Sequence, residues 1–339
     1  MEQKTKKQHY VPQMYLKLWG ITGENQIHVY DKELEKARIN NIEDVASQRY
    51  FYDVNPNHIF SGKTIEELKK LGLEWETEEK SQGLEYAFAE EIEKPFSGFL
   101  RELISNANSA TPWHINNCYF VFPDEKADFS AYLAFQFMRT KRVRDSVLDA
   151  ADCLSQAMEE MKFPESGRER YLISKEKAKE LHVQMLVDAK NMAEVAAQFC
   201  KLTWMLGLNR TKKLFYTTDN PIATYGHLKQ PYTYMSMNGL SSKGVEVFFP
   251  LSPNIILIMV DGSYHTELRS RERRYIEITN TKNVDFYNSL LSMEANRFVF
   301  SKDGDFSLLD EMKKREPQSL KKRTVKLEWG GKTFYPREE

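Results

Sequence analysis

The chain has 339 residues, of which 41% are hydrophobic and 12% aromatic, and this composition excludes a wholly disordered protein. Its 48 Lys and Arg residues nearly balance its 49 Asp and Glu residues. The net charge of −1 therefore excludes an overall positive field that would attract nucleic acid or an anionic membrane, and any basic surface must be local.

The cysteines and the apolar segments indicate a reducing, cytoplasmic location. Cys118, Cys153 and Cys200 are too few and too widely spaced for a disulfide framework, and none has the CxxC spacing of a zinc site. The polar N-terminal segment is unlike a secretion signal. The longest apolar run, residues 245–260, is interrupted by polar residues and is shorter than the roughly 20 residues that a membrane helix requires. We therefore expect no membrane association.

Residues 1–60 are predicted to form a short helix followed by a small sheet. Pro12 at a helix start and Gly20 at its end bound the segment QMYLKLW, whose apolar residues have helical spacing. Alternating β-forming residues at 26–30 (QIHVY) and 49–54 (RYFYDV) predict two strands of one sheet.

Residues 61–208 are predicted to be helical. Apolar residues recur at positions i, i+3 and i+4 over 64–108, 124–163 and 175–207, which is typical of packed helices. The first of these blocks is interrupted near Pro95.

Residues 209–339 are predicted to be rich in strands. Short runs of β-forming residues are bounded by Pro, Gly and Asn, and they are KKLFYTTDNP, GVEVFFPLSPNIILIMVDG, RYIEI and RFVFS. Residues 245–260 should form a pair of buried strands, residues 283–294 a helix, and the Gly330-Gly331 pair a hairpin after the basic linker KKREPQSLKKR. We therefore expect an α+β fold, in which a small N-terminal sheet, a large helical middle and a C-terminal mixed or antiparallel sheet form one composite domain over residues 1–339.

The chain contains no Walker loop, GxGxxG, GxSxG, HExxH or EF-hand motif, so the familiar enzyme classes lose support. One candidate catalytic residue is His9, because its ring precedes a helix start and can reach the same space as Gln13, one turn further on. The alternative is a partly exposed histidine packed near Tyr10.

A second candidate is the corner Asp219-Asn220-Pro221. It places a carboxylate and an amide at the end of a predicted strand, where proline prevents regular continuation. Such a corner can present both groups to a pocket, but it is equally typical of an Asx-turn that satisfies nearby backbone N–H groups.

Gln136 and Arg139 form a third candidate. Their i, i+3 spacing places them on one helix face beside the apolar residues, and the planar fork of Arg139 matches phosphate oxygens. The neighbouring Lys141, Arg142 and Arg144 are more typical of a solvated face. The basic tracts 269–274 and 313–323 could contact nucleic acid, although their interspersed glutamates favour solvated loops.

The segments QHYVPQMYLKLW, FQFMRT and FYTTDNP resemble three blocks of a bacterial family of unknown function, the domain of unknown function 4238 family, which opens on His-Tyr-Val-Pro-Gln. The blocks spread over most of the chain, and the first is the most specific. Lys141 departs from the family's Arg-Thr-Pro, and Thr218 replaces the serine of Ser-Asp-Asn-Pro. A family glutamate corresponds best to Glu93, with Glu90 and Glu91 as alternatives.

The resemblance implies no settled activity, but some members of the family are associated with antiphage defence, where nucleases are common. The sequence hypothesis is therefore a phosphodiester-cleaving nuclease, acting on RNA or DNA, with Mg²⁺ as a candidate cofactor. The expected roles are proton transfer for His9, phosphate binding for Arg139, substrate orientation for Gln13, Gln136 and Asn220, and metal binding or orientation of His9 for Asp219 with Glu93.

Two alternatives remain open from the sequence. The first is a non-catalytic sensor or toxin-like protein that binds a phage product or a nucleotide, and the second is a buried polar network with a purely structural role. The aromatic content is also compatible with a homo-oligomer.

Overall fold

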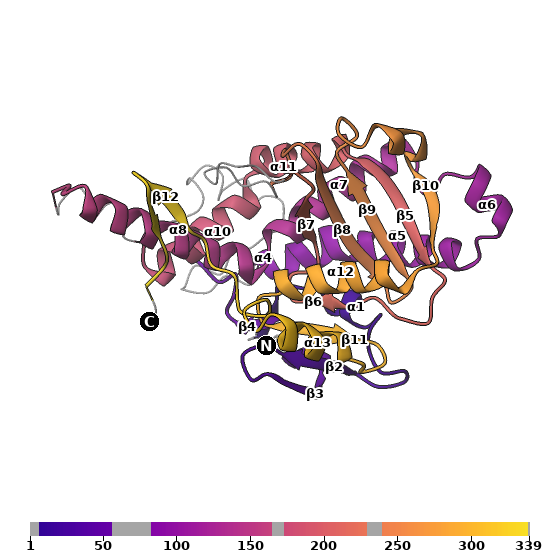
Figure 1. Ribbon diagram of the computed structural model, residues 1–339, viewed down its shortest axis with the longest axis horizontal. Helices are drawn as coiled ribbons and strands as arrows, with labels where there is room; N and C mark the ends of the chain where they lie inside the picture. The colour runs from indigo at the N-terminus through magenta and orange to yellow at the C-terminus, as the bar shows by residue number, and fades with distance from the viewer. Residues whose placement is uncertain (1–6, 56–82, 165–172, 229–238, 338–339) are drawn as a thin grey trace.

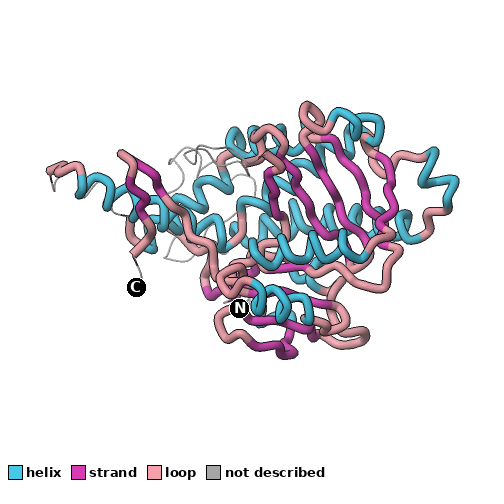
Figure 2. The backbone as a smooth tube through the Cα atoms, in the orientation of Figure 1, coloured by secondary structure: helices cyan, strands magenta, loops and turns pink. Residues whose placement is uncertain are grey.

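The computed structural model describes residues 7–55, 83–164, 173–228 and 239–337 (Figures 1 and 2). It confirms the α+β class. A five-stranded sheet lies between helices, and a four-stranded sheet lies beside it. Within the described residues, no helix is both long and apolar enough to cross a bilayer.

The larger sheet has the order β10-β5-β9-β8-β7, and only the β10–β5 pair is parallel. Its strands are β5 (Thr203–Asn209), β7 (Ala223–Gly226), β8 (Val245–Ser252), β9 (Ile255–Val260) and β10 (Arg274–Ile278). Every residue of β8 and β9 is buried, which confirms the predicted pair of buried strands. The predicted helix up to residue 207 is wrong at its end, because β5 begins at Thr203 and its run of apolar residues is buried on both faces.

Helices cover both faces of this sheet (Figure 1). Side chains of α12 (Thr281–Glu294) pack with Phe248 and Ile258 on one face, whereas those of α5 (Lys94–Asn108) and α7 (Pro123–Met138) share a core with Phe249 and Leu257 on the other. Since neighbouring residues of a strand point to opposite faces, the continuous apolar run of β8 fills both cores.

The smaller sheet has the antiparallel order β3-β2-β11-β6. It joins the N-terminal strands β2 (Gln26–Asp31) and β3 (Lys36–Asn41) to β6 (Thr217–Thr218) and β11 (Phe298–Ser301) from the C-terminal part. Strands β2 and β3 therefore do not form a sheet of their own.

The predicted strand over residues 49–54 is wrong. In this part of the chain, β4 (Ser47–Arg49) pairs with β1 (Lys7–His9). The chain leaves this two-stranded sheet at Tyr50, which has a φ of 54°. Phe51 and Tyr52 turn into the core, where the backbone N–H of Tyr52 donates to the Gln8 side chain at 2.6 Å. The Gln8 side chain thus accepts the hydrogen bond that the backbone of a neighbouring strand would otherwise accept.

The helical middle is confirmed for the described residues, while residues 56–82 of the first predicted block lie outside them. Pro95 marks the start of α5, and the block 124–163 is two helices that break at Arg139 and Thr140. The remaining helices are α1 (Gln13–Leu16), η1 (Ile42–Asp44), α4 (Gly83–Ala87), the π-helix η2 (Phe88–Glu93), α6 (Pro112–Asn117), α8 (Lys141–Glu160), α10 (Lys175–Val187), α11 (Ala189–Lys201), η4 (Thr266–Arg271) and α13 (Ser307–Arg315).

The predicted C-terminal hairpin is confirmed as β12 (Leu327–Trp329) and β13 (Lys332–Phe334). The basic linker before it is partly helical, because α13 extends to Arg315.

The short helix α1 fixes the N-terminal segment against the larger sheet. Tyr15 donates through its hydroxyl to the Pro250 carbonyl at 2.7 Å, and the Trp19 indole donates to the Phe215 carbonyl at 2.8 Å. Both side chains are buried in the main core. These contacts hold the preceding His9 in one place.

We expect Gly207→Ala to lower the free energy of unfolding by about 1–3 kcal/mol, because an added Cβ would lie 2.8 Å from side-chain carbons of Ile256 and Ile278. Urea unfolding measures the change. Gly98→Ala is the matched control: Gly98 lies inside α5 with open space around it, so that substitution should be neutral or stabilising. Equal effects of the two changes would contradict this packing.

Candidate functional site

Arg139, at the C-terminal end of α7, is the centre of a buried polar cluster. Its side chain is 1% exposed. Nη1 donates to Glu93 Oε1 at 2.5 Å, Nη2 to the His9 carbonyl at 2.6 Å, and Nε to the Tyr52 hydroxyl at 3.0 Å. Burial opposes the charge, but the tyrosine and the carboxylate outweigh it and raise the pKa of Arg139. One guanidinium group thus joins three distant segments.

The turn that carries Arg139 is held by a second buried layer. His182 Nε2 hydrogen-bonds the Met138 carbonyl at 2.8 Å, and Arg144 donates to His182 Nδ1 at 3.0 Å and to the Phe51 carbonyl at 2.8 Å. Burial, followed by the charge of Arg144, lowers the pKa of His182 to about 3, so its ring is neutral. This layer fixes both Arg139 and the loop that precedes Tyr52.

The π-helix η2 brings a second carboxyl group to the same cluster. Glu85 and Glu93 are eight positions apart, which is about 2.2 turns of a regular α-helix, so their side chains would be offset around the helix axis. The π turn has more residues per turn and removes most of this angular offset. Glu93 pairs with the guanidinium group, and Glu85 lies close enough for both charges to act on its pKa.

Glu85 has a carboxyl group that titrates near neutral pH. Its Oε2 atom is buried and has no hydrogen-bond partner within the described residues. Burial is the main cause that raises the pKa of Glu85 to about 7, and the backbone N–H of His9 partly opposes the increase. Sequence reasoning considered Glu90, Glu91 and Glu93 but missed Glu85, and the only signal was its two-turn spacing from Glu93.

The ring of His9 is buried in the same cluster and is neutral at pH 7. Burial lowers the pKa of His9; hydrogen bonds with the backbone of Ile42 and Glu43 oppose the shift, and the charge of Arg139 adds to it. The amide Nε2 of Gln13 lies 3.4 Å from His9 Nδ1, while His9 Nε2 is buried without a partner among the described residues. The orientation of the Gln13 amide sets the tautomer of the His9 ring. When the amide donates to Nδ1, the ring proton is on Nε2; when the amide is rotated by half a turn and accepts from Nδ1, the ring proton is on Nδ1.

Two further unpartnered polar atoms come from α7. Tyr132, Gln136 and Arg139 lie on one face, at positions i, i+4 and i+7. Gln136 Nε2 donates to the Tyr10 carbonyl at 3.2 Å, but Gln136 Oε1 and the Tyr132 hydroxyl are buried with no partner in the part of the chain that the structure describes. Buried polar groups are normally satisfied, so several unsatisfied atoms around one ion pair make this cluster the candidate site.

Asp219 and Asn220 belong to a neighbouring group. Asp219 is fully buried, and its two oxygens accept the backbone N–H groups of Asn296 at 2.8 Å and Arg297 at 2.9 Å. Asn220 donates to the Glu294 carbonyl at 3.2 Å. Burial raises the pKa of Asp219 to about 6. These hydrogen bonds join the corner to the C-terminal end of α12 and to the residues that precede β11, as expected for a corner with a structural role.

Tyr10 links the two groups. Its carbonyl accepts from Gln136, and the charge of Asp219, after burial, raises the pKa of its phenol. The structure thus brings together around Arg139 five of the residues selected from the sequence, which are His9, Gln13, Glu93, Gln136 and Arg139. No direct contact joins Asp219 or Asn220 to His9 or Glu93 within the described residues.

The expected Mg²⁺ site does not fit these residues. Glu93 is paired with Arg139, and both oxygens of Asp219 are occupied by backbone amides. Over the described ranges, no group of three His, Cys, Asp or Glu side chains could hold a metal ion. We therefore derive no chemical step through a metal at Asp219 and Glu93.

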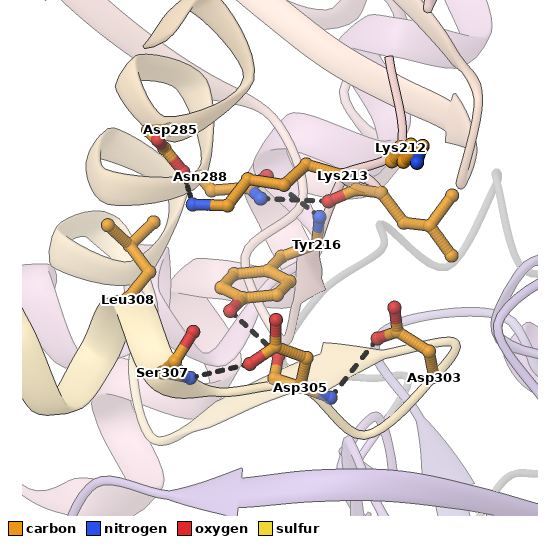
Figure 3. Close-up of a pocket in the computed structure, with 10 residues that line it drawn as sticks. Lys212, Lys213, Tyr216, Asp285, Asn288, Asp303, Asp305, Ser307 and Leu308 are labelled. Atoms are coloured by element: carbon orange, nitrogen blue, oxygen red, sulfur yellow. Dashed lines mark hydrogen bonds and ion pairs between the residues drawn. The ribbon is translucent and has the colours of Figure 1, made fainter. Parts of the chain in front are cut away.

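A surface pocket of about 50 Å³ lies elsewhere, between the loop that precedes β6 and the segment that leads into α13 (Figure 3). Lys213 pairs with Asp285 across it at 2.5 Å, and Tyr216 donates to the Asp305 carbonyl at 2.8 Å. Its volume suits one or two water molecules, so it is too small for a nucleotide.

We expect Arg139→Met to lower the free energy of unfolding by about 3–5 kcal/mol, because it leaves Glu93 and the His9 carbonyl without their buried donor. Chemical denaturation gives the value. The control Arg210→Met removes an ion pair with Glu277 whose side chains are 41% and 45% exposed, and it should change stability by less than about 1 kcal/mol. Similar losses in both variants would contradict the central role of Arg139.

We expect Glu85→Gln to stabilise the protein at pH 8 by about 3 kcal/mol, with no gain below pH 4.5. The folded pKa of Glu85, about 7, lies above its ordinary value of 4.5, so the charged form penalises folding increasingly as the pH rises through this window. Melting curves from pH 4 to 8 measure the gain. Glu90→Gln, at an exposed pair with Lys94, should show no such gain, and a pH-independent effect of Glu85→Gln would refute the assignment.

A family model described as "Protein of unknown function (DUF4238)" matches residues 7–305, a range that includes the Arg139 cluster and the Asp219 corner. No curated protein and no solved structure matches the chain. The chain therefore belongs to the DUF4238 family.

Proposed function

We propose that this protein cleaves RNA by general acid–base chemistry in the Arg139 cluster. The observation that carries the proposal is the pair of unpartnered buried atoms, His9 Nε2 and Glu85 Oε2, beside one ion pair. Burial lowers the pKa of His9 and raises that of Glu85 to about 7, so a neutral imidazole and a protonated carboxyl group can coexist, as an acid–base pair requires.

The two groups divide the reaction between them. With the Gln13 amide turned to accept from His9 Nδ1–H, His9 Nε2 takes the proton of a ribose 2′-hydroxyl. The freed 2′-oxygen attacks the adjacent phosphorus, the bond from phosphorus to the 5′-oxygen breaks, and protonated Glu85 gives its proton to that oxygen. The products are a 2′,3′-cyclic phosphate and a 5′-hydroxyl, and the exchanged proton states of the two residues are restored by water.

The other residues of the cluster position this pair. Each of the three nitrogens of Arg139 donates to an internal acceptor, so in this proposal it holds His9, Tyr52 and Glu93 in place and does not bind phosphate. Gln136 Oε1 and the Tyr132 hydroxyl are the groups left to contact the substrate. The cluster reaches solvent at Glu93, whose side chain is 21% exposed.

The proposed mechanism favours RNA over DNA, because the attacking group is the 2′-hydroxyl. We place this activity in the cytoplasm and in antiphage defence, following the association of some family members. We further propose that residues 1–339 act as one composite domain, and the main core supports this because it contains Trp19, Phe129 and Phe249 from the three successive parts of the chain.

Cleavage of labelled single-stranded RNA, tRNA and DNA, with Mg²⁺ and with a chelator, tests the proposal. We expect cleavage of RNA in the chelator, and a loss of about 100-fold or more in His9→Ala, because a positioned acid or base contributes about that much. His28→Gln, in β2, is the matched control and should retain full activity.

The pH dependence gives a second readout. Activity needs neutral His9 and protonated Glu85, so the optimum should lie between the lowered pKa of His9 and about 7. Nucleotide binding without cleavage of any substrate would overturn the nuclease and support the sensor. If the protein neither binds nor cleaves any of these substrates, and His9→Ala is less stable than the wild type, the cluster is a structural network.

A further inference from the structure

The C-terminal arm, residues 321–337, lies outside the packed cores. None of its residues is buried, and the last buried side chain before it is Leu320. The hairpin of β12 and β13 lies within the arm and runs along α8, which projects from the body of the protein (Figure 1). Because the arm has no buried side chain, the hydrophobic effect holds it less strongly than it holds the rest of the chain.

Four carboxylates on one side of α8 hold the arm, at spacings of four, three and seven residues. They belong to Asp145, Asp149, Asp152 and Glu159, which we name the α8 stripe. Lys322 pairs with the first at 2.8 Å, and Arg337 pairs with the last at 3.0 Å. The two carboxylates between them accept the backbone N–H groups of Val325 at 3.1 Å and Arg337 at 2.6 Å.

The arm has an excess of positive charge. It contains six Lys and Arg residues and one glutamate, and that glutamate, Glu328, pairs within the arm with Lys326 at 2.8 Å. The cations that bind the α8 stripe are partly exposed, with Lys322 40% and Arg337 51% accessible. Exposed ion pairs are individually weak and are screened by salt, so another polyanion can replace the α8 stripe as their partner.

Two large aromatic side chains of the arm face solvent. Trp329 is 57% exposed and Tyr335 59%. Trp329 lies directly opposite Lys332 in the hairpin, and the Lys332 side chain is 60% exposed. Directly opposed residues of an antiparallel pair have their side chains on the same face, so an aromatic ring and a cation lie side by side there. Aromatic rings beside cations are the groups with which proteins bind single-stranded nucleic acid.

We propose that the C-terminal arm binds single-stranded RNA, and that the α8 stripe occupies its cationic groups in the free protein. Phosphates would take the place of the carboxylates, and unpaired bases would stack on Trp329 and Tyr335. The choice of RNA as the ligand rests on the proposed function, to which the arm adds an element that holds the substrate. The test measures binding, so it can fail or succeed independently of cleavage.

Fluorescence anisotropy of the full chain with a labelled 2′-O-methyl RNA 12-mer tests the proposal. This probe lacks the attacking 2′-hydroxyl, so the proposed reaction cannot cleave it. We expect the double variant Trp329→Ala, Lys332→Gln to bind at least about ten-fold more weakly, since one stacked base contributes about that much. The control Trp113→Ala, Lys190→Gln removes an exposed tryptophan and an exposed lysine elsewhere, and it should bind as the wild type does.

Removal of the internal competitor should have the opposite effect. We expect Asp152→Asn, Glu159→Gln to bind the same RNA about three-fold more tightly, because two groups that hold Arg337 are lost. The control Glu194→Gln, Glu277→Gln makes the same change of charge at exposed pairs elsewhere, and it should have a smaller effect.

Cys153 reports whether the arm leaves α8. Its thiol is fully buried, and it donates to the Phe334 carbonyl at 3.5 Å and the Val325 carbonyl at 3.7 Å. In the full chain carrying Cys118→Ser and Cys200→Ser, this is the one remaining thiol. We expect saturating RNA probe to increase its rate of reaction with a dipyridyl disulfide several-fold.

Three outcomes would overturn the proposal. If the wild type does not bind the probe, or binds it no better than the arm variant, the arm is not an RNA-binding element. If RNA leaves the reactivity of Cys153 unchanged, the α8 stripe does not compete with it. If the arm variant loses binding to phosphatidylserine vesicles but not to RNA, the arm binds a membrane instead. Cleavage of unmodified RNA that is equal in the wild type and the arm variant would leave the ribonuclease standing without this arm.

Discussion

The buried guanidinium group of Arg139 is the interaction on which the site depends. It pairs with Glu93 and holds the His9 carbonyl and the Tyr52 hydroxyl, so it ties the N-terminal strand, the loop after β4 and the π-helix to the end of α7. The charged group can leave water only because each of its three nitrogens has an acceptor. Arg139 therefore has a structural role, and in the proposed function other groups contact the phosphate.

The same burial shifts the two ionisations that the proposed function uses. Removing His9 and Glu85 from water shifts their pKa values past each other, to below 6.5 for the imidazole and up to about 7 for the carboxyl group. A purely structural network would satisfy its polar atoms, whereas here His9 Nε2 and Glu85 Oε2 have no partner within the described residues.

The sequence predicted the features that depend on local patterns. The helix start at Pro12 and the buried strands β8 and β9 follow from residue spacing alone. The sequence did not indicate Tyr52, because a hydrogen bond to the Gln8 side chain replaces strand pairing there. It did not indicate Glu85, because a π turn brings this residue toward Glu93. The family blocks correctly indicated His9, Gln136 and Arg139 as neighbours. They could not reveal that Asp219 is occupied by backbone amides, since these come from residues 296–297.

The ionisation of Glu85 is the most direct test of this account. Carboxyl-detected NMR titration, with the signal assigned by its absence in Glu85→Gln, measures the pKa of this group in the intact protein. The account requires a midpoint near 7, far above the ordinary value of 4.5, as expected for a buried carboxyl group with one unpartnered oxygen. A midpoint at or below 4.5 would mean that the carboxylate is paired or hydrated, and the Arg139 cluster would then be a structural network without a proton to give.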